Sequence, residues 1–355
     1  AFSVPQSRRV LDSDVAPDLI FRANVGVEHQ FSKSLNFQMG YSHSEVRRSQ
    51  RTLNINAPLG GTYNPAFPTS GVRPLGQAGG NVFEFQSNGR SSSDSFYFGM
   101  NGKIAKKIDF WANYSWNNTR ALDGGTSGSP FDAYDFSHEW GRATWDIRHW
   151  FNVSASYQTK SGFSINTFIL ANSGPPFNIT TGRDTNGDTS FSERPAFATD
   201  LSKPGVVMTP YGALDPNPTP GQQIIPRNFA QGPIFVSVNF GASKMFKFGR
   251  AIEPKAPPAT ATGKAPTVSA TSAPAVAGPG AATPAKPPVQ RPYSLLFSVY
   301  VSNALNRTNA STPVGNMTSP FFLKSTSTSG FFFFSGGGGG ASGNRQITLR
   351  MRLSF

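Results

Sequence analysis

Apolar and polar side chains alternate in segments of about ten residues that recur along the chain. The last eleven residues show the pattern most clearly. One face carries Ile347, Leu349, Met351, Leu353 and Phe355, while glutamine, threonine, serine and two arginines occupy the positions between them. About ten residues is the length that a tilted strand needs to cross a bilayer. The alternation therefore predicts β-strands with one face toward lipid and the other toward water.

The same reading predicts nine membrane strands in an all-β, antiparallel sheet. Residues 82–89 are expected to extend one of these strands outside the membrane rather than to add a tenth. The nine strands are expected at 18–31, 35–46, 96–104, 108–116, 145–157, 163–169, 234–243, 293–302 and 346–355.

The connections between these strands alternate in length. Those near 32–34, 105–107 and 160–162 are short, whereas those at about 47–92, 120–144, 174–231 and 306–344 are long. Bacterial outer-membrane barrels have short periplasmic turns and long extracellular loops. The pattern therefore predicts an extracellular start for the first strand and a periplasmic C-terminus.

The strand count is odd, although single-chain bacterial barrels have even numbers of strands. A nine-strand sheet with open edges would leave unpaired backbone groups in lipid. We therefore expect the C-terminal part of a larger barrel, with a miscounted strand as the alternative. Residue 1 is Ala, without the basic start and apolar core of a signal peptide, so the chain reads as processed or as a fragment.

Three regions are predicted from composition. Residues 1–249 hold strands and long extracellular loops, and residues 292–355 hold the last two strands. Residues 250–291 are rich in Pro, Ala and Thr, a composition that cannot bury a core, so we expect a disordered or polyproline-like periplasmic insert.

Composition also excludes several classes of protein. Charged residues make up 14% of the chain, against about 25% in soluble domains, which disfavours a cytosolic enzyme. Cysteine is absent, so thiolate catalysis and disulfides are excluded. The net charge of +13 raises the question of nucleic-acid binding, but the positive residues are scattered and no binding motif accompanies them.

Four segments together resemble the C-terminal barrel region of TonB-dependent receptors of the Oar-like type, which carry a carboxypeptidase-regulatory-like domain at their N-terminus. These segments are 145–157 with its Asp-x-Arg-His sequence, 173–195 with its Ser-Gly-x-Pro-Phe and Asp-x-Asn-Gly-Asp…Arg-Pro sequences, 295–307, and the last eleven residues. The likeness spans the chain except for 250–291.

The resemblance implies a barrel of about 22 strands, a plug, and periplasmic TonB as a partner. It identifies Ile347, Leu349, Met351, Leu353 and Phe355 as the β-signal read by the barrel-assembly machinery. Plug, energy-coupling box and regulatory-like domain are missing from these residues, so energised uptake is implied by the resemblance alone. We expect a receptor that binds and takes up a substrate in the outer membrane, in contact with lipid and lipopolysaccharide.

One loop carries oxygen-bearing side chains at alternating positions, as calcium loops do. They are Asp184, Asn186, Asp188, Ser190 and Glu193. Thr189 stands where an EF-hand has its sharp-turn Gly, and Pro195 stands where it has its bidentate Glu. Calcium binding is therefore one interpretation, and a solvent-exposed turn that needs no metal is the other and the favoured one.

Basic residues fall on the polar phase of several strands and predict a positively charged lumen. They are Arg22, Lys103, Arg148, Lys247, Arg350 and Arg352. Such a lumen would favour anionic ligands. The favoured alternative is that these residues pair with a plug or with lumenal carboxylates such as Asp109 and Asp146.

No catalytic motif is present, so we expect no enzyme. Asp132, Asp135, His138 and Glu139 form the one cluster of candidate catalytic groups, and a hydrated loop explains them equally well. Phe331–Phe334, followed by glycines 336–340, would place apolar surface in an extracellular loop. Such surface suits contact with a partner protein, a neighbouring barrel or the loop cluster over the lumen, and a loop folded back onto its own barrel explains it equally well. The alternative function is thus a structural or adhesive barrel whose loops contact a partner or matrix.

Overall fold

The computed structural model describes residues 7–105, 107–122, 130–250, 291–329 and 343–355. Within these ranges the chain is built from strands, with one short 3-10 helix, η1 (Gln77–Gly79). None of the helical structure in the described part is long and apolar enough to span a membrane. The predicted insert at 250–291, the segment Phe331–Phe334 and the glycines 336–340 lie almost wholly outside the described residues.

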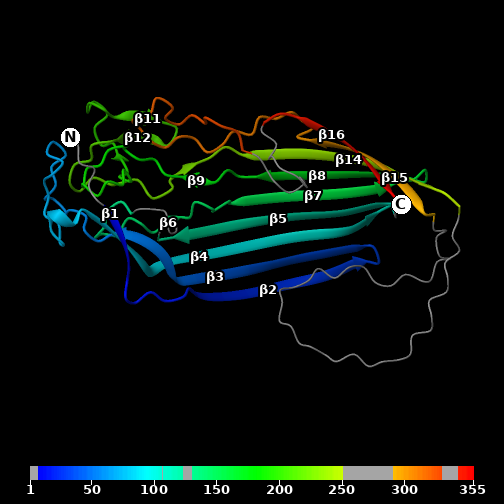
Figure 1. Cartoon of the computed structure of the whole chain (residues 1–355), viewed down its shortest axis with the longest axis horizontal. Helices are drawn as coiled ribbons and strands as arrows, with labels where there is room; N and C mark the ends of the chain where they lie inside the picture. Colours follow the sequence, from blue (N-terminus) through cyan, green and yellow to red (C-terminus); the bar gives the residue numbers. More distant parts are fainter. Residues whose placement is uncertain (1–6, 106, 123–129, 251–290, 330–342) are drawn as a thin grey trace, which may run out of the picture.

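Nine long strands form one sheet in which every neighbouring pair is antiparallel, as Figure 1 shows. The nine-strand, all-β antiparallel prediction is confirmed. The order across the sheet is β16-β15-β14-β8-β7-β5-β4-β3-β2. The strands are β2 (Leu19–Ser32), β3 (Leu35–Asn54), β4 (Asn81–Ile104), β5 (Ile108–Ala121), β7 (His149–Gln158), β8 (Phe163–Asn172), β14 (Phe235–Phe248), β15 (Tyr293–Ser302) and β16 (Gln346–Ser354).

The register places apolar residues on one face and polar residues on the other. Phe98 is paired with Met39 and Tyr114, and one position along, Gly99 is paired with Gln38. Directly paired residues share a face, and the alternation holds across all nine strands. We call these the apolar face and the polar face. On β4 the apolar face runs from Ile104 to Phe96, about 27 Å of strand, or about 21 Å of height at a typical barrel tilt.

Several strands extend farther than the alternation predicted, and β3 and β4 do so most. Residues 47–54 of β3 pair with 83–90 of β4, with irregular register near Arg47, Ser49 and Arg51. The connection between them is therefore 55–80 rather than 47–92, and residues 82–89 form the expected extension of a strand. The parallel strand β1 (Ser7–Leu11) pairs with this extension at Asn81–Phe85.

The predicted strand at 145–157 begins later, at His149. The correction has a local cause. The backbone N–H of Thr119, at the end of β5, donates to the Asp146 carboxylate at 2.8 Å rather than to a backbone carbonyl. Residues 143–148 therefore turn over the end of β5, beside the two-residue strand β6 (Gly141–Arg142).

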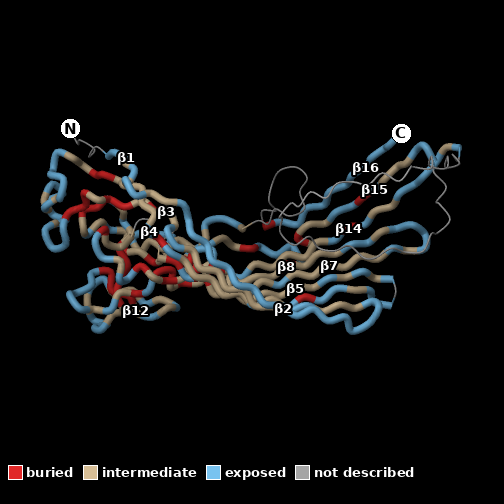
Figure 2. Tube along the Cα trace, turned by 90° about the horizontal axis from the view of Figure 1, so that it is seen from below, coloured by how far each residue is buried: buried red, intermediate tan, exposed pale blue. Residues whose placement is uncertain are grey.

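The long connections fold into a packed layer at one end of the sheet, opposite the C-terminus (Figure 1). We call it the loop layer. Figure 2 shows that buried residues concentrate there. Its main apolar cluster contains Phe177, Ile179, Leu214, Ile225 and Ala230. Its short strands were not predicted, because two to four residues are too few to show alternation. They are β9 (Pro176–Phe177), β10 (Ala196–Phe197), β11 (Val207–Thr209), β12 (Gly212–Asp215) and β13 (Ala230–Gln231).

Close packing on the polar face of β2–β4 depends on two glycines. The Tyr97 ring lies over Gly26 and Gly40, and a Cβ added at Gly40 would come within 2.6 Å of the ring. A Cβ at Gly26 would stand 2.9 Å from the Tyr97 hydroxyl. A side chain at Gly40 therefore cannot be accommodated unless Tyr97 moves.

We expect Gly40→Val to destabilise the barrel by about 1–3 kcal/mol, because it overpacks this contact. Adding Tyr97→Ala should recover most of that loss, since the two residues are in contact and their effects are not additive. Urea unfolding of the full-length protein in detergent micelles measures both effects. Gly60→Val, where a Cβ would meet nothing within 4 Å, is the control. An unchanged midpoint for Gly40→Val would contradict the packing.

Candidate functional site

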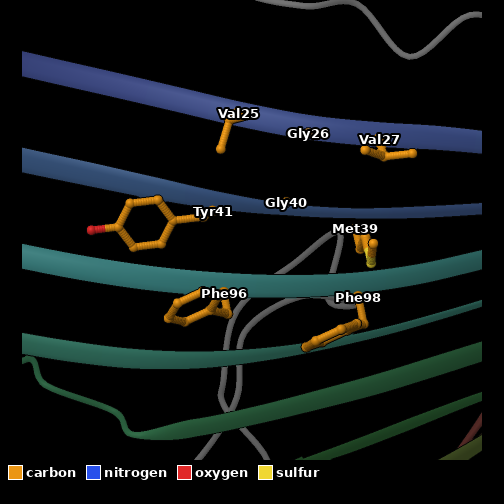
Figure 3. Close-up of a pocket in the computed structure, with 8 residues that line it drawn as sticks. All are labelled: Val25, Gly26, Val27, Met39, Gly40, Tyr41, Phe96 and Phe98. Carbon is orange, nitrogen blue, oxygen red and sulfur yellow. The ribbon is translucent and has the colours of Figure 1, made fainter.

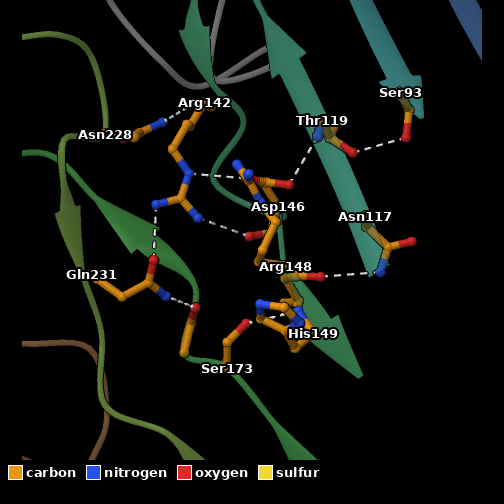
Figure 4. Close-up of polar contacts among 12 residues, drawn as sticks. Ser93, Asn117, Thr119, Arg142, Asp146, Arg148, His149, Ser173, Asn228 and Gln231 are labelled. Carbon is orange, nitrogen blue, oxygen red and sulfur yellow. Dashed lines mark hydrogen bonds and ion pairs between the residues drawn. The ribbon is translucent and has the colours of Figure 1, made fainter. Parts of the chain in front are cut away.

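Asp146 organises the junction between the sheet and the loop layer (Figure 4). Its carboxylate is fully buried. One oxygen accepts the Thr119 N–H, and the other accepts Arg142 Nε at 2.9 Å and Arg148 Nη2 at 3.1 Å. Because two guanidiniums and a backbone donor satisfy it, Asp146 holds the end of β5 against the start of β7.

Arg142 carries this network into the next loop. Its Nη1 donates to Gln231 Oε1 at 2.8 Å, and the Gln231 amide donates to the Gly174 carbonyl. Asn228 Nδ2 donates to the Arg142 carbonyl at 2.5 Å. The loops after β5 and β8 are therefore joined through side chains, as Figure 4 shows.

A second carboxylate, Glu139, is buried between two arginines. Its Oε1 accepts Arg194 Nη2 at 2.9 Å, and its Oε2 accepts Arg227 Nη1 at 3.0 Å. Both arginines are buried as well, and burial lowers the pKa of Arg194. Arg227 also donates to the Leu122 carbonyl at 3.0 Å. This triad fixes the loop after β5 to two points of the loop between β8 and β14.

The predicted calcium loop is closed by its own backbone. Asp184 accepts the N–H groups of Gly187 and Thr189, at 2.6 and 2.9 Å. Asp188 accepts the Ser190 N–H at 2.7 Å. Asn186 Oδ1 and Glu193 Oε1 likewise accept backbone N–H groups. These bonds are those of an Asx-rich turn.

The turn is only partly solvent-exposed, whereas the sequence predicted a solvent-exposed one: Thr185 and Thr189 are exposed. Asp188 and Glu193 are buried, and burial raises the pKa of both carboxyls. Arg73 Nη2 donates to the Gly187 carbonyl at 3.0 Å, and Asn186 Nδ2 donates to the Phe131 carbonyl at 3.1 Å. The loop thereby joins two neighbouring loops. Among the described residues no group of three or more acidic, His or Cys side chains is arranged to hold a metal, and calcium binding by this loop stays a prediction.

The register places five of the six predicted basic residues on the polar face, and the sixth, Arg148, lies just before β7 begins. Lys103 forms an ion pair with Asp109, and Arg148 forms one with Asp146, as the pairing alternative anticipated. Arg350 lies over the Tyr300 ring at 5.8 Å. In the described part of the chain, no carboxylate pairs with the three other residues, which are Arg22, Lys247 and Arg352.

The remaining predicted residues divide between the sheet and the loops. All five residues of the proposed β-signal are exposed. The first four lie on the apolar face of β16, at the edge of the sheet, and Phe355 directly follows this strand. Their role in assembly stays a prediction. In the candidate catalytic cluster, Asp132 accepts the N–H of Tyr134 and Asp135 that of Ser137, while Glu139 belongs to the triad.

Sequence reasoning missed the partners of Glu139. Arg194 and Arg227 lie 55 and 88 residues away from it, and neither position shows a periodicity. The one available signal for Arg194 was its place in the Arg194-Pro195 sequence of segment 173–195, which resembles a segment of Oar-like receptors.

Comparisons with known proteins agree with this geometry. The family model described as "Outer membrane beta barrel domain" matches residues 1–253. No curated protein matches the sequence. The outer membrane transporter YddB from Escherichia coli is similar in structure, with a TM-score of 0.51 and 10% identity, over 99% of this chain and 35% of that one.

Two further solved structures show weaker similarity. For the ferric enterobactin receptor PfeA from Pseudomonas aeruginosa the TM-score is 0.43 at 8% identity, covering 95% of this chain and 31% of that one. For the FrpB iron transporter from Neisseria meningitidis the TM-score is 0.42 at 8% identity, covering 98% of this chain and 32% of that one. The chain thus spans about one third of the length of these proteins.

We expect Glu139→Ala to destabilise the loop layer by about 3–5 kcal/mol, because it leaves two buried guanidiniums without their carboxylate. Limited proteolysis and thermal unfolding of the full-length protein measure the effect. Asp200→Ala removes an exposed carboxylate of the same layer and serves as the control. Equal protease resistance of the two variants would show that the triad does not hold the loops.

Proposed function

We propose, from the premise that this chain belongs to the family of outer membrane β-barrel domains, that it forms the C-terminal wall of an outer-membrane receptor that takes up a substrate. The loop layer is the mouth of this receptor, and the polar face lines its lumen. Four motif segments that resemble Oar-like TonB-dependent receptors support the finer assignment.

One observation carries the proposal. In the described sheet, β2 and β16 each pair with a single neighbour. A sheet in lipid must have every backbone group paired, so such edges require further strands. Barrels of about 22 strands enclose a lumen wide enough to need a plug. On this proposal, the missing strands and the plug belong to the same receptor.

The polar face suits a lumen that passes polar molecules. It carries Ser, Asn and Gln together with Arg22, Lys247 and Arg352, for which the described strands provide no carboxylate. Exposed cations that converge on a water-filled space raise the local concentration of anions. The basic residues thus either favour an anionic substrate or pair with carboxylates of the plug.

The proposed orientation follows from the lengths of the connections. The loop layer faces the exterior, where it meets the substrate and lipopolysaccharide, and the short turns and the C-terminus face the periplasm. TonB acts from the periplasm through the part of the receptor that precedes this sheet. No step of this proposal requires the chain to act as an enzyme.

The native protein from outer-membrane fractions tests the proposal. We expect an intact mass well above the 38.1 kDa of this chain, an N-terminal sequence from a preceding segment, and capture by the periplasmic domain of TonB. A receptor variant from which the plug segment has been deleted serves as the control. It should no longer be captured by the periplasmic domain of TonB. A large barrel that binds matrix or a partner cell but does not bind TonB would instead establish the adhesive alternative.

A further inference from the structure

Positively charged side chains occupy the short connections at the end of the sheet where the C-terminus lies (Figure 1). The turns after β2, β4 and β7 belong to this end, and Phe248 at the end of β14 is paired there with Tyr293 at the start of β15. Each of these four connections carries an exposed cation, and their described residues include no Asp or Glu. The four cations, which we call the basic rim, are Lys33, Lys107, Lys160 and Arg250.

The turns do not need these cations for their own conformation. In the turn after β2, the Ser34 N–H donates to Ser32 Oγ at 3.2 Å. In the turn after β7, the Phe163 N–H donates to Thr159 Oγ1 at 2.9 Å. Hydroxyl side chains and glycine are ordinary turn residues, whereas lysine has no special role in a turn. The positive charges at these places therefore call for another explanation.

The described strands do not neutralise the basic rim. Two carboxylates lie at this end of the strands, and both are bound elsewhere. Glu28 accepts a hydrogen bond from the Asn36 amide, and Asp109 forms an ion pair with Lys103. None of the four rim cations forms an ion pair with a described residue. The rim is therefore a row of positive charges open to solvent.

The order of the strands sets the spacing of this row. The four connections join consecutive pairs across the sheet, namely β2 with β3, β4 with β5, β7 with β8, and β14 with β15. Neighbouring strands are about 4.8 Å apart, so successive cations are about 10 Å apart along the sheet end. A single row of charges at equal steps matches an extended polymer that carries negative charges at intervals.

The rim is distinct from the surface that suits lipid. Midway along β2–β4, the apolar face has a cavity of about 280 Å³ (Figure 3). No charged side chain lines it, and its larger side chains are those of Val25, Val27, Met39, Tyr41, Phe96 and Phe98. On β4 and β5 the apolar side chains continue to the pair Ile104 and Ile108, and Lys107 follows in the turn. The cations therefore begin where the apolar face ends.

The shape of the rim argues against other anionic partners. Phosphate sites gather paired guanidinium donors around one group, whereas single cations about 10 Å apart cannot converge on one phosphate. A folded acidic protein would need a contact of about 800 Å² with an apolar centre. The described turn residues are Ser, Thr, Ala, Gly, Lys and Arg, which provide no such centre and no aromatic ring on which nucleic-acid bases could stack.

We propose that the basic rim binds the cell-wall glycan of the periplasm, peptidoglycan, whose stem peptides carry carboxylates at intervals along each glycan strand. Each rim cation would pair with one carboxylate. Single exposed ion pairs are weak, but several pairs along one polymer add through their high effective concentration. The inference rests on the proposed function, because that function places the short turns in the periplasm.

Co-sedimentation of the full-length protein, in detergent, with purified sacculi tests the inference. The parent protein should sediment with sacculi, and its binding should weaken as ionic strength rises. The rim variant should bind at least about fivefold more weakly. It combines Lys33→Gln, Lys107→Gln, Lys160→Gln and Arg250→Gln. Sacculi whose carboxylates have been converted to amides should bind the parent protein as weakly, which tests the contact even if the rim variant assembles poorly.

A control variant removes the same charge at the opposite end of the sheet and should bind sacculi as the parent does. It combines Arg8→Gln, Arg9→Gln, Arg120→Gln and Lys324→Gln, which are all exposed in the structure. An equal loss in the control variant would overturn the inference, because net charge alone would then explain the binding.

Three other results would also overturn the inference. They are equal binding by the parent and the rim variant, equal binding of the parent to native and amidated sacculi, and phosphatidylglycerol vesicles that bind as tightly with the same dependence on the four cations. The last result would assign the rim to phospholipid. Failure of the proposed function gives a different result, namely a protein that TonB does not capture, and sedimentation with sacculi does not depend on that capture.

Discussion

The pairing of backbone N–H and C=O groups between neighbouring strands is the constraint on which the rest of this structure depends. In lipid nothing else can satisfy these groups, so each strand must have two partners. Pairing in fixed register also sets the side of every residue, because a shift by one position would exchange the two faces. The apolar face and the polar face both follow from it.

Outside the membrane a different interaction holds the chain. The loop layer is fastened by carboxylates buried among arginines, with Asp146 at the end of the sheet and Glu139 between two loops. Such networks add little net stability over apolar packing, but breaking one is costly. They therefore serve to fix the positions of the loops.

The strands were predictable because a half-buried strand carries its own signal. Alternation over ten residues located all nine, and the register of β16 agrees with the faces assigned to Ile347 and Arg350. The loop layer was not predictable in the same way. Residues 145–148 do not join the predicted strand, because the Asp146 carboxylate accepts the Thr119 N–H in place of a backbone carbonyl. Arg227 forms its ion pair with Glu139 across 88 residues of sequence. Contacts of that kind depend on tertiary structure and leave no local pattern.

The most direct test of the central claim is whether successive residues of one strand meet water and lipid in turn. Since this chain has no cysteine, single cysteines introduced at Val153, Ser154, Ala155 and Ser156 of β7 can carry spin labels in the membrane-inserted protein. Labels at Ser154 and Ser156 should be relaxed by a water-soluble nickel chelate, and those at Val153 and Ala155 by oxygen dissolved in lipid. Equal accessibility at all four positions, or the reverse order, would contradict a barrel wall with the faces described here.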